Sequence, residues 1–197
     1  MTAPILDPLR LPVAQFAADA QELDGDWAVA ELPRLADSEC PPDAGSTVSR
    51  AAAEPERRVH WHAIGFHKPV GGQQQIWMSL TADADVVLQC QRCLLPLDEH
   101  VQVDRHFHFV EDEATAAALD DEMEDDVLVL TRSLNLRELV EDEMLLALPL
   151  VPRHEVCPEP LPRAFGDVEI VEEAAHPFAA LAMLRKDKDG DGGSEAG

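Results

Sequence analysis

Two short motifs that contain cysteine could together bind a metal ion. Cys90 and Cys93 form a Cys-x-x-Cys pair, which supplies half of the ligands of a tetrahedral zinc site. His154 and Cys157 have the same spacing further along the chain and could supply the other half. Both pairs would lie just beyond the end of a regular element, where tight turns let side chains converge. The sequence therefore predicts a zinc site made of these four residues.

The same cysteines have two other interpretations. They could be buried, reduced thiols that bind nothing, with His154 and Cys157 unrelated to them in a loop. They could also be a thiol redox pair, because Arg92 between them would lower their pKa and favour thiolates. A thioredoxin-like pair, however, begins a helix after a strand, and Pro96 argues against a helix there.

One segment combines cations with an aromatic residue and could contact RNA directly. Its candidate binding residues are Arg57, Arg58, His60, His62 and Lys68. Compared with a groove for single-stranded nucleic acid, this set of cations is sparse. The polar face of an ordinary strand is the alternative interpretation.

Four histidines alternate with other residues on two predicted strands. His60 and His62 share one strand face, and so do His106 and His108. If those strands were neighbours, their imidazoles could form a second metal site. Alternating histidines are more commonly the solvated face of a strand.

The charge of the chain is strongly negative. Its 197 residues hold 15 Lys and Arg against 39 Asp and Glu, a formal net charge of −24. Such a surface repels phosphate backbones and attracts basic partners. The phosphate-binding, nucleophile-elbow and zinc-protease motifs of common enzymes are absent, so we predict a protein that is not an enzyme and has no small-molecule substrate.

Hydrophobic periodicity predicts an α+β fold. Every even position from Ile76 to Leu88 is apolar, which is typical of a long strand with one buried face. Further strands are predicted at 57–66, 100–110 and 126–130. Asn135 is a good N-cap for a main helix over 135–148, and Pro177 could begin a short C-terminal helix. We expect an antiparallel sheet, which could be barrel-like, with these two helices.

Three segments are predicted to lack regular structure because of their composition. Residues 38–56 are rich in Pro and Ala, residues 111–126 are acidic with no basic residue, and the tail at 186–197 is rich in Gly and charge. We therefore expect a single domain over 1–185 that contains the first two as flexible loops. No signal peptide or membrane span is predicted, and four cysteines in this chain fit a reduced, cytoplasmic setting.

Three motifs in this order resemble the YceD family, the large ribosomal RNA subunit accumulation proteins. They are the cysteine signature LQCQRCLLPL at 88–97, the helix and following loop at 134–154, and HPFAALAMLRK at 176–186, where His176 takes the place of the family's usual Asn. The stretch at 23–35 is similar more loosely, and the insertion at 111–126 matches only in being acidic. The resemblance extends over roughly 6–186.

This resemblance implies a role in the synthesis, processing or stability of the large-subunit ribosomal RNA. It brings no catalytic residue and no established cofactor. Combined with the net charge of −24, it leads to the hypothesis of a ribosome-biogenesis factor that contacts a basic ribosomal protein or assembly factor and reaches rRNA directly or through that partner.

Overall fold

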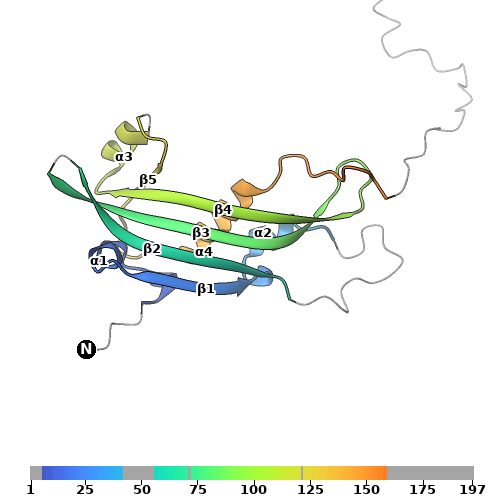
Figure 1. Cartoon of the computed structure of the whole chain (residues 1–197), viewed down its shortest axis with the longest axis horizontal. Helices are drawn as coiled ribbons and strands as arrows, with labels where there is room; N and C mark the ends of the chain where they lie inside the picture. The colour runs from blue at the N-terminus through green and yellow to red at the C-terminus, as the bar shows by residue number, and fades with distance from the viewer. Residues whose placement is uncertain (1–5, 42–55, 71, 121, 159–197) are drawn as a thin grey trace, which may run out of the picture. The chain divides into compact units, whose positions relative to one another are not determined.

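The computed structural model describes residues 6–41, 56–70, 72–120 and 122–158. The chain divides into two compact units, Met1–Pro160 and Leu161–Gly197, and all the described residues lie in the first. The described residues form five strands with helices around them (Figure 1). In chain order the elements are η1 (Pro8–Arg10), α1 (Val13–Ala18), β1 (Glu22–Ala28), η2 (Val29–Glu31), α2 (Pro33–Ser38), β2 (Arg58–Val70), β3 (Gln73–Gln89), β4 (Pro96–Val110), α3 (Glu113–Asp120), β5 (Asp126–Val129) and α4 (Leu136–Ala147).

The strands form one open sheet in the order β1-β2-β3-β4-β5. The first four strands are antiparallel neighbours. Antiparallel pairing was expected for β2, β3 and β4, but β1 was not predicted as a strand. The fifth strand pairs with β4 in parallel, so the sheet is mixed, and β1 and β5 are its edges rather than partners in a barrel. A parallel neighbour needs a crossover connection, and the segment that contains α3 provides it. The predicted α+β class is confirmed.

The apolar alternation of β3 determines which face of the sheet is buried. Its even residues from Met78 to Leu88 are all buried in the main core, where β4 adds Val101, Val103, Phe107 and Phe109. Because side chains alternate between the two faces of a strand, the odd residues of β3 point to the opposite side. The six-residue link 90–95 joins β3 to β4 as antiparallel neighbours.

Helices α1 and α4 pack on this apolar face of the sheet. Asn135 caps α4 as predicted, since its side chain accepts a hydrogen bond from the Glu138 N–H at 3.4 Å. The buried residues Leu136, Val140 and Met144 follow at helical spacing. Helix α1 approaches β2 closely at Gly65, where an added Cβ would lie 2.6 Å from the Phe16 ring. Glycine is needed there because no other residue fits between the helix and the strand.

The acidic segment 111–126 contains a helix, although we expected no regular structure there. Asp112 begins α3 by accepting hydrogen bonds from the N–H of Thr115 at 2.9 Å and from its hydroxyl at 3.0 Å. These bonds hold the pKa of Asp112 below its ordinary value. Alanines, the strongest helix formers, fill the middle of α3, and Ala116 is buried. Most of the acidic residues lie outside the helix, so their repulsion does not prevent it.

Several predictions concern residues outside the described ranges. These are most of the 38–56 segment, the helix that starts at Pro177, the tail at 186–197 and the domain limit at 185. The strand predicted at 126–130 is present as β5 and is half-buried at the sheet edge. Among the described helices, none has the length and apolar character needed to cross a membrane.

Candidate metal centre

A tight turn at the end of β3 presents the first pair of thiols. Cys90 is fully buried, its N–H donates to the carbonyl of Leu95 at 3.0 Å, and its own carbonyl accepts from the Leu94 N–H at 2.9 Å. Leu94 has a φ of 62°, the left-handed conformation that such a turn requires. This backbone brings the half-buried Cys93 back toward Cys90.

The loop that follows α4 brings the second pair to the same place. The N–H of Gln91 donates to the carbonyl of Pro152 at 2.9 Å, so the loop lies directly against the turn. One ligand atom from each of four residues then lies within 4.8 Å of all the others, and these residues are Cys90, Cys93, His154 and Cys157. The predicted convergence of the two motifs is therefore present, and this group could hold a metal ion.

His154 is oriented as a ligand by its second ring nitrogen. Its Nε2 lies 3.1 Å from the carbonyl oxygen of Pro96, which can only accept a hydrogen bond. Nε2 therefore carries the proton, and Nδ1 is left with a lone pair. Nδ1 faces the Cys93 sulfur at 3.4 Å. Metal-binding histidines are commonly fixed in this way, by a carbonyl that accepts the hydrogen of the other nitrogen.

The surroundings of the sulfur atoms stabilise negative charge. Burial by itself would raise the pKa of the Cys90 thiol, but the backbone N–H groups of Cys93, His154 and Arg92 point at the sulfur and lower the pKa to about 5. Arg92 donates from Nε to the Cys157 sulfur at 3.0 Å. It also donates to the carbonyl oxygens of His154 and Glu155, at 2.7 and 3.2 Å. Arg92 thus contacts the second pair, whereas the sequence placed it with the first.

The four donors suit a tetrahedral metal ion. Zn–S bonds of about 2.3 Å separate tetrahedral ligands by roughly 3.8 Å, so small side-chain rotations would bring this group to that spacing. Three thiolates and Zn²⁺ would leave one net negative charge, which the Arg92 guanidinium offsets. Burial raises the pKa of the Cys93 thiol, and the nearby sulfurs of Cys157 and Cys90 raise it further. A divalent cation among the sulfurs would relieve that repulsion.

Three of the five candidate RNA-binding residues have carboxylate partners. Arg58 pairs with Asp26 on β1 and with Glu56, the latter at 3.1 Å. His62 Nε2 lies 2.6 Å from Glu22. Arg57 forms an ion pair with Glu39 at 2.7 Å, and His60 is exposed opposite Asp26. Lys68 is the last of the predicted set, and its Nζ lies 4.6 Å from the centroid of the Trp77 ring, over the face of that ring.

The two histidine pairs do not form a second cluster. They occupy β2 and β4, and β3 lies between these strands. His108 is buried and stacks on Trp77 with ring centroids 4.8 Å apart. Burial lowers the pKa of His108, the nearby charge of Lys68 lowers it further, and Asp125 acts in the opposite direction. Trp61 and Trp77 are buried, and Trp27 is half-buried and stacks against Trp61.

Sequence reasoning missed two buried carboxylates on α4. Glu141 accepts hydrogen bonds from the backbone N–H groups of Arg34 and Leu35, at 2.7 and 3.3 Å, and also pairs with the Arg34 side chain. Glu143 lies 3.3 Å from Arg105 on β4. Burial raises the pKa of Glu143, and Arg105 lowers it. Both glutamates lie beside the apolar face of α4 in the sequence, which could have indicated their burial. That position does not indicate which residues they contact.

Comparison with known proteins assigns the chain to a family. No solved structure matches it. One family matches over residues 78–185, which is more than half of the chain and includes all four residues of the candidate metal centre. The description of that family is "Large ribosomal RNA subunit accumulation protein YceD". The chain therefore belongs to the YceD family, as its three sequence motifs indicated.

Proposed function

We propose that this protein is a non-enzymatic factor of large-subunit biogenesis that acts in the cytoplasm through a basic ribosomal protein or assembly factor. The family to which the chain belongs supports the role in accumulation of large-subunit rRNA. The net charge of −24 is the observation that favours a protein partner over bare RNA. Proteins that bind rRNA carry positive charge to meet its phosphates, so they are the natural partners of an acidic factor.

We further propose that the candidate centre holds a structural zinc ion. Cys90, Cys93, His154 and Cys157 offer four protein ligands, which leaves no open position for a substrate. Such a centre would fasten the loop after α4 to the β3–β4 turn. The orientation of His154 and the contact of Arg92 with Cys157 support this assignment.

The other two hypotheses have less support. Direct RNA binding would require Arg57, Arg58 and His62 to leave carboxylate partners. Thiol redox catalysis by Cys90 and Cys93 would have to work with two further metal-ligand side chains, His154 and Cys157, beside the pair. A redox pair also normally begins a helix, and the residues after Cys93 turn into β4.

Affinity capture of the tagged full chain from cells at moderate salt tests the partner. We expect a basic ribosomal protein or assembly factor, identified by mass spectrometry, to be captured with or without ribonuclease treatment. Substitution Arg58→Glu should not weaken this capture, because Arg58 is already paired with acids and its replacement only makes the surface more negative. Recovery of bare rRNA without a basic protein, lost in that variant, would contradict the proposal and favour RNA contact through β2.

A further inference from the structure

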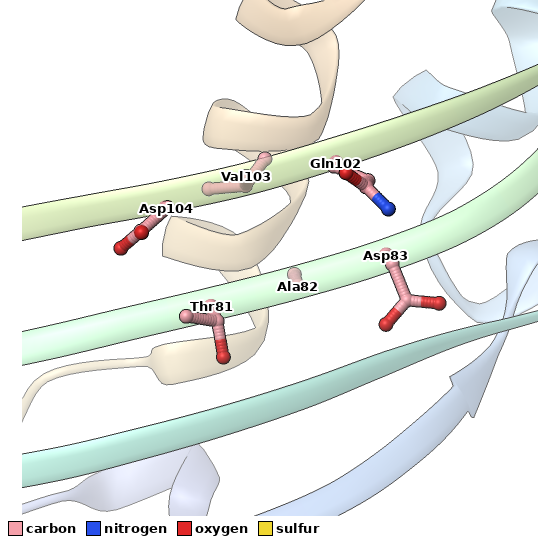
Figure 2. A pocket seen from close by; sticks show the side chains of 6 residues that line it. All are labelled: Thr81, Ala82, Asp83, Gln102, Val103 and Asp104. Atoms are coloured by element: carbon pink, nitrogen blue, oxygen red, sulfur yellow. The ribbon is translucent and has the colours of Figure 1, made fainter.

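The sheet has a second face that the core helices do not cover, here called the open face. It carries the residues of β1 to β4 whose side chains alternate with those that point into the core. Examples are His62, Thr81 and Asp104, which lie side by side in the sheet register. Figure 2 shows the side chains of Thr81, Asp83 and Asp104 on the near side of the strands, with a helix behind them. Among the described helices, α3 lies at the β5 edge of the sheet, where it contacts β5 and β4 (Figure 1).

This open face is acidic. The sheet register places seven carboxylates on it against two cations, Arg58 and Lys68. The seven are Glu22, Asp24, Asp26, Asp83, Asp85, Asp98 and Asp104. Each is exposed or half-buried, so each keeps access to solvent and to a partner. A rigid sheet thus holds an array of negative charge at fixed spacing.

Part of this charge has no counter-ion within the described chain. Asp26 pairs with Arg58, Glu22 with His62, and Asp85 with His100 at 2.7 Å. Among the residues that the structure describes, Asp24, Asp83 and Asp104 form no ion pair. The uncompensated charge therefore extends across the open face, from Asp24 on the edge strand β1 to Asp83 on β3 and Asp104 on β4.

A shallow hollow between β3 and β4 lies on the same face. Its walls are polar on the open face, where Thr81, Asp83, Gln102 and Asp104 surround it. Figure 2 shows these side chains spread around the hollow and not closing over it. Two carboxylates and two neutral acceptors around one depression suit the ammonium or guanidinium group of a long side chain.

We propose that the open face binds an extended segment of a partner protein that is rich in lysine and arginine. The proposal deepens and rests on the proposed function, since it names the surface that receives the basic partner. Asp24 and Asp26 alternate along β1, and Asp83 and Asp85 along β3. An extended peptide repeats its side chains at the same period of two residues, about 6.8 Å, so its cations can match these pairs. The sign of the charge disfavours a nucleic acid backbone as the occupant.

The acidic segment 111–126 is the competing surface. It holds more carboxylates for its length, including the exposed Glu113, Glu122 and Glu124. These residues lie on and after α3, and not in the paired strands that fix the acids of the open face. The two surfaces can be separated because charge can be removed from each in equal amount.

Binding of a labelled peptide to the full chain tests the proposal. The probe is a peptide of about 12 residues in which lysine alternates with serine, measured by fluorescence anisotropy at roughly 0.05 M salt, where exposed charge pairs are weakly screened. We expect the triple variant Asp24→Asn, Asp83→Asn, Asp104→Asn to bind about tenfold more weakly than the unaltered chain. The matched control, Glu113→Gln, Glu122→Gln, Glu124→Gln, changes the net charge equally and should bind within about twofold.

Thermal unfolding of both variants checks that the fold is retained, which is expected because the six residues are solvent-accessible. Equal weakening by both variants would overturn the proposal, because the peptide would then be attracted by the net charge of the whole protein and not by one surface. Weakening by the control alone would overturn it by placing the site on the acidic segment. No binding to the unaltered chain, or binding of single-stranded RNA lost in the triple variant, would also overturn it. An unchanged rRNA ratio after removal of the gene would contradict the proposed function alone and leave the peptide result standing.

Discussion

Protein purified without chelator should contain about one zinc ion per chain, and the double substitution Cys90→Ser, Cys93→Ser should abolish it. The reason is that Cys90, Cys93, His154 and Cys157 have converged from two elements, with the tautomer of His154 fixed by Pro96. Metal analysis by mass spectrometry of the intact, full-length chain measures the content directly.

Loss of the metal should also destabilise the fold. Without the metal, the turn and the loop after α4 would be held together by the hydrogen bond from the Gln91 N–H to the Pro152 carbonyl and by the hydrogen bond from Arg92 to the His154 carbonyl. We expect the midpoint of thermal unfolding to fall by about 10 °C when zinc is removed by chelation and to recover when zinc is restored. Cys40→Ser is the matched control, since Cys40 is outside the four-residue group and its substitution should keep the zinc. A metal-free wild type that is fully folded would end the zinc assignment.

Substitution Glu141→Ala should be the most destabilising change of a single charged residue on α4. Glu141 caps the first turn of α2 from a different helix, because Leu32 at the N-cap position has no side chain that can do so. Removing the carboxylate leaves two backbone N–H groups without their acceptor. We expect a loss of about 2–4 kcal/mol in the free energy of unfolding, measured with denaturant. The half-exposed Arg34 side chain contributes little of this.

The neighbouring Asp142 gives the control for this experiment. It also bonds to Arg34, at 2.5 Å, but it is half-exposed and accepts no backbone N–H of α2. Asp142→Asn should therefore change the free energy of unfolding by less than about 0.5 kcal/mol. If both substitutions had equal, small effects, the contact between α2 and α4 would depend on apolar packing and not on the buried carboxylate.

The parts of the fold that were predictable have strong local periodicity. The even positions of β3 are apolar from Ile76 to Leu88, and α4 combines an N-cap with an apolar face. The short link between β3 and β4 leaves antiparallel pairing as the natural arrangement. The candidate centre was predictable for a related reason. Two pairs of ligands with equal spacing each followed a recognisable element, so their convergence required only that the two elements end near each other.

The missed parts depend on contacts between distant residues. β1 mixes Gly25 with acidic residues, so its sequence reads as a loop until β2 is there to pair with it. The parallel pairing of β5 is set by the crossover through α3, which charge counting had placed in a loop. The partners of Glu141 lie more than 100 positions away in the sequence. No local pattern encodes such contacts, because burial is decided by the assembled core.

The structure links the charge of the chain to a defined surface. Three of the candidate RNA-binding residues, Arg57, Arg58 and His62, already have acidic partners within the chain. Two of the uncompensated acids on the open face, Asp83 and Asp104, line the hollow between β3 and β4. An acidic surface of this kind would act on rRNA through a basic protein, which is the central claim of the proposed function.

The ratio of large- to small-subunit ribosomal RNA, in cells with and without this gene at matched growth rate, tests that role most directly. We predict a selective fall in the large-subunit RNA when the gene is absent. Re-expression of the chain should restore the ratio, and the triple variant of Asp24, Asp83 and Asp104 should restore it poorly. An unchanged ratio in cells that lack the gene would contradict a role in large-subunit RNA accumulation.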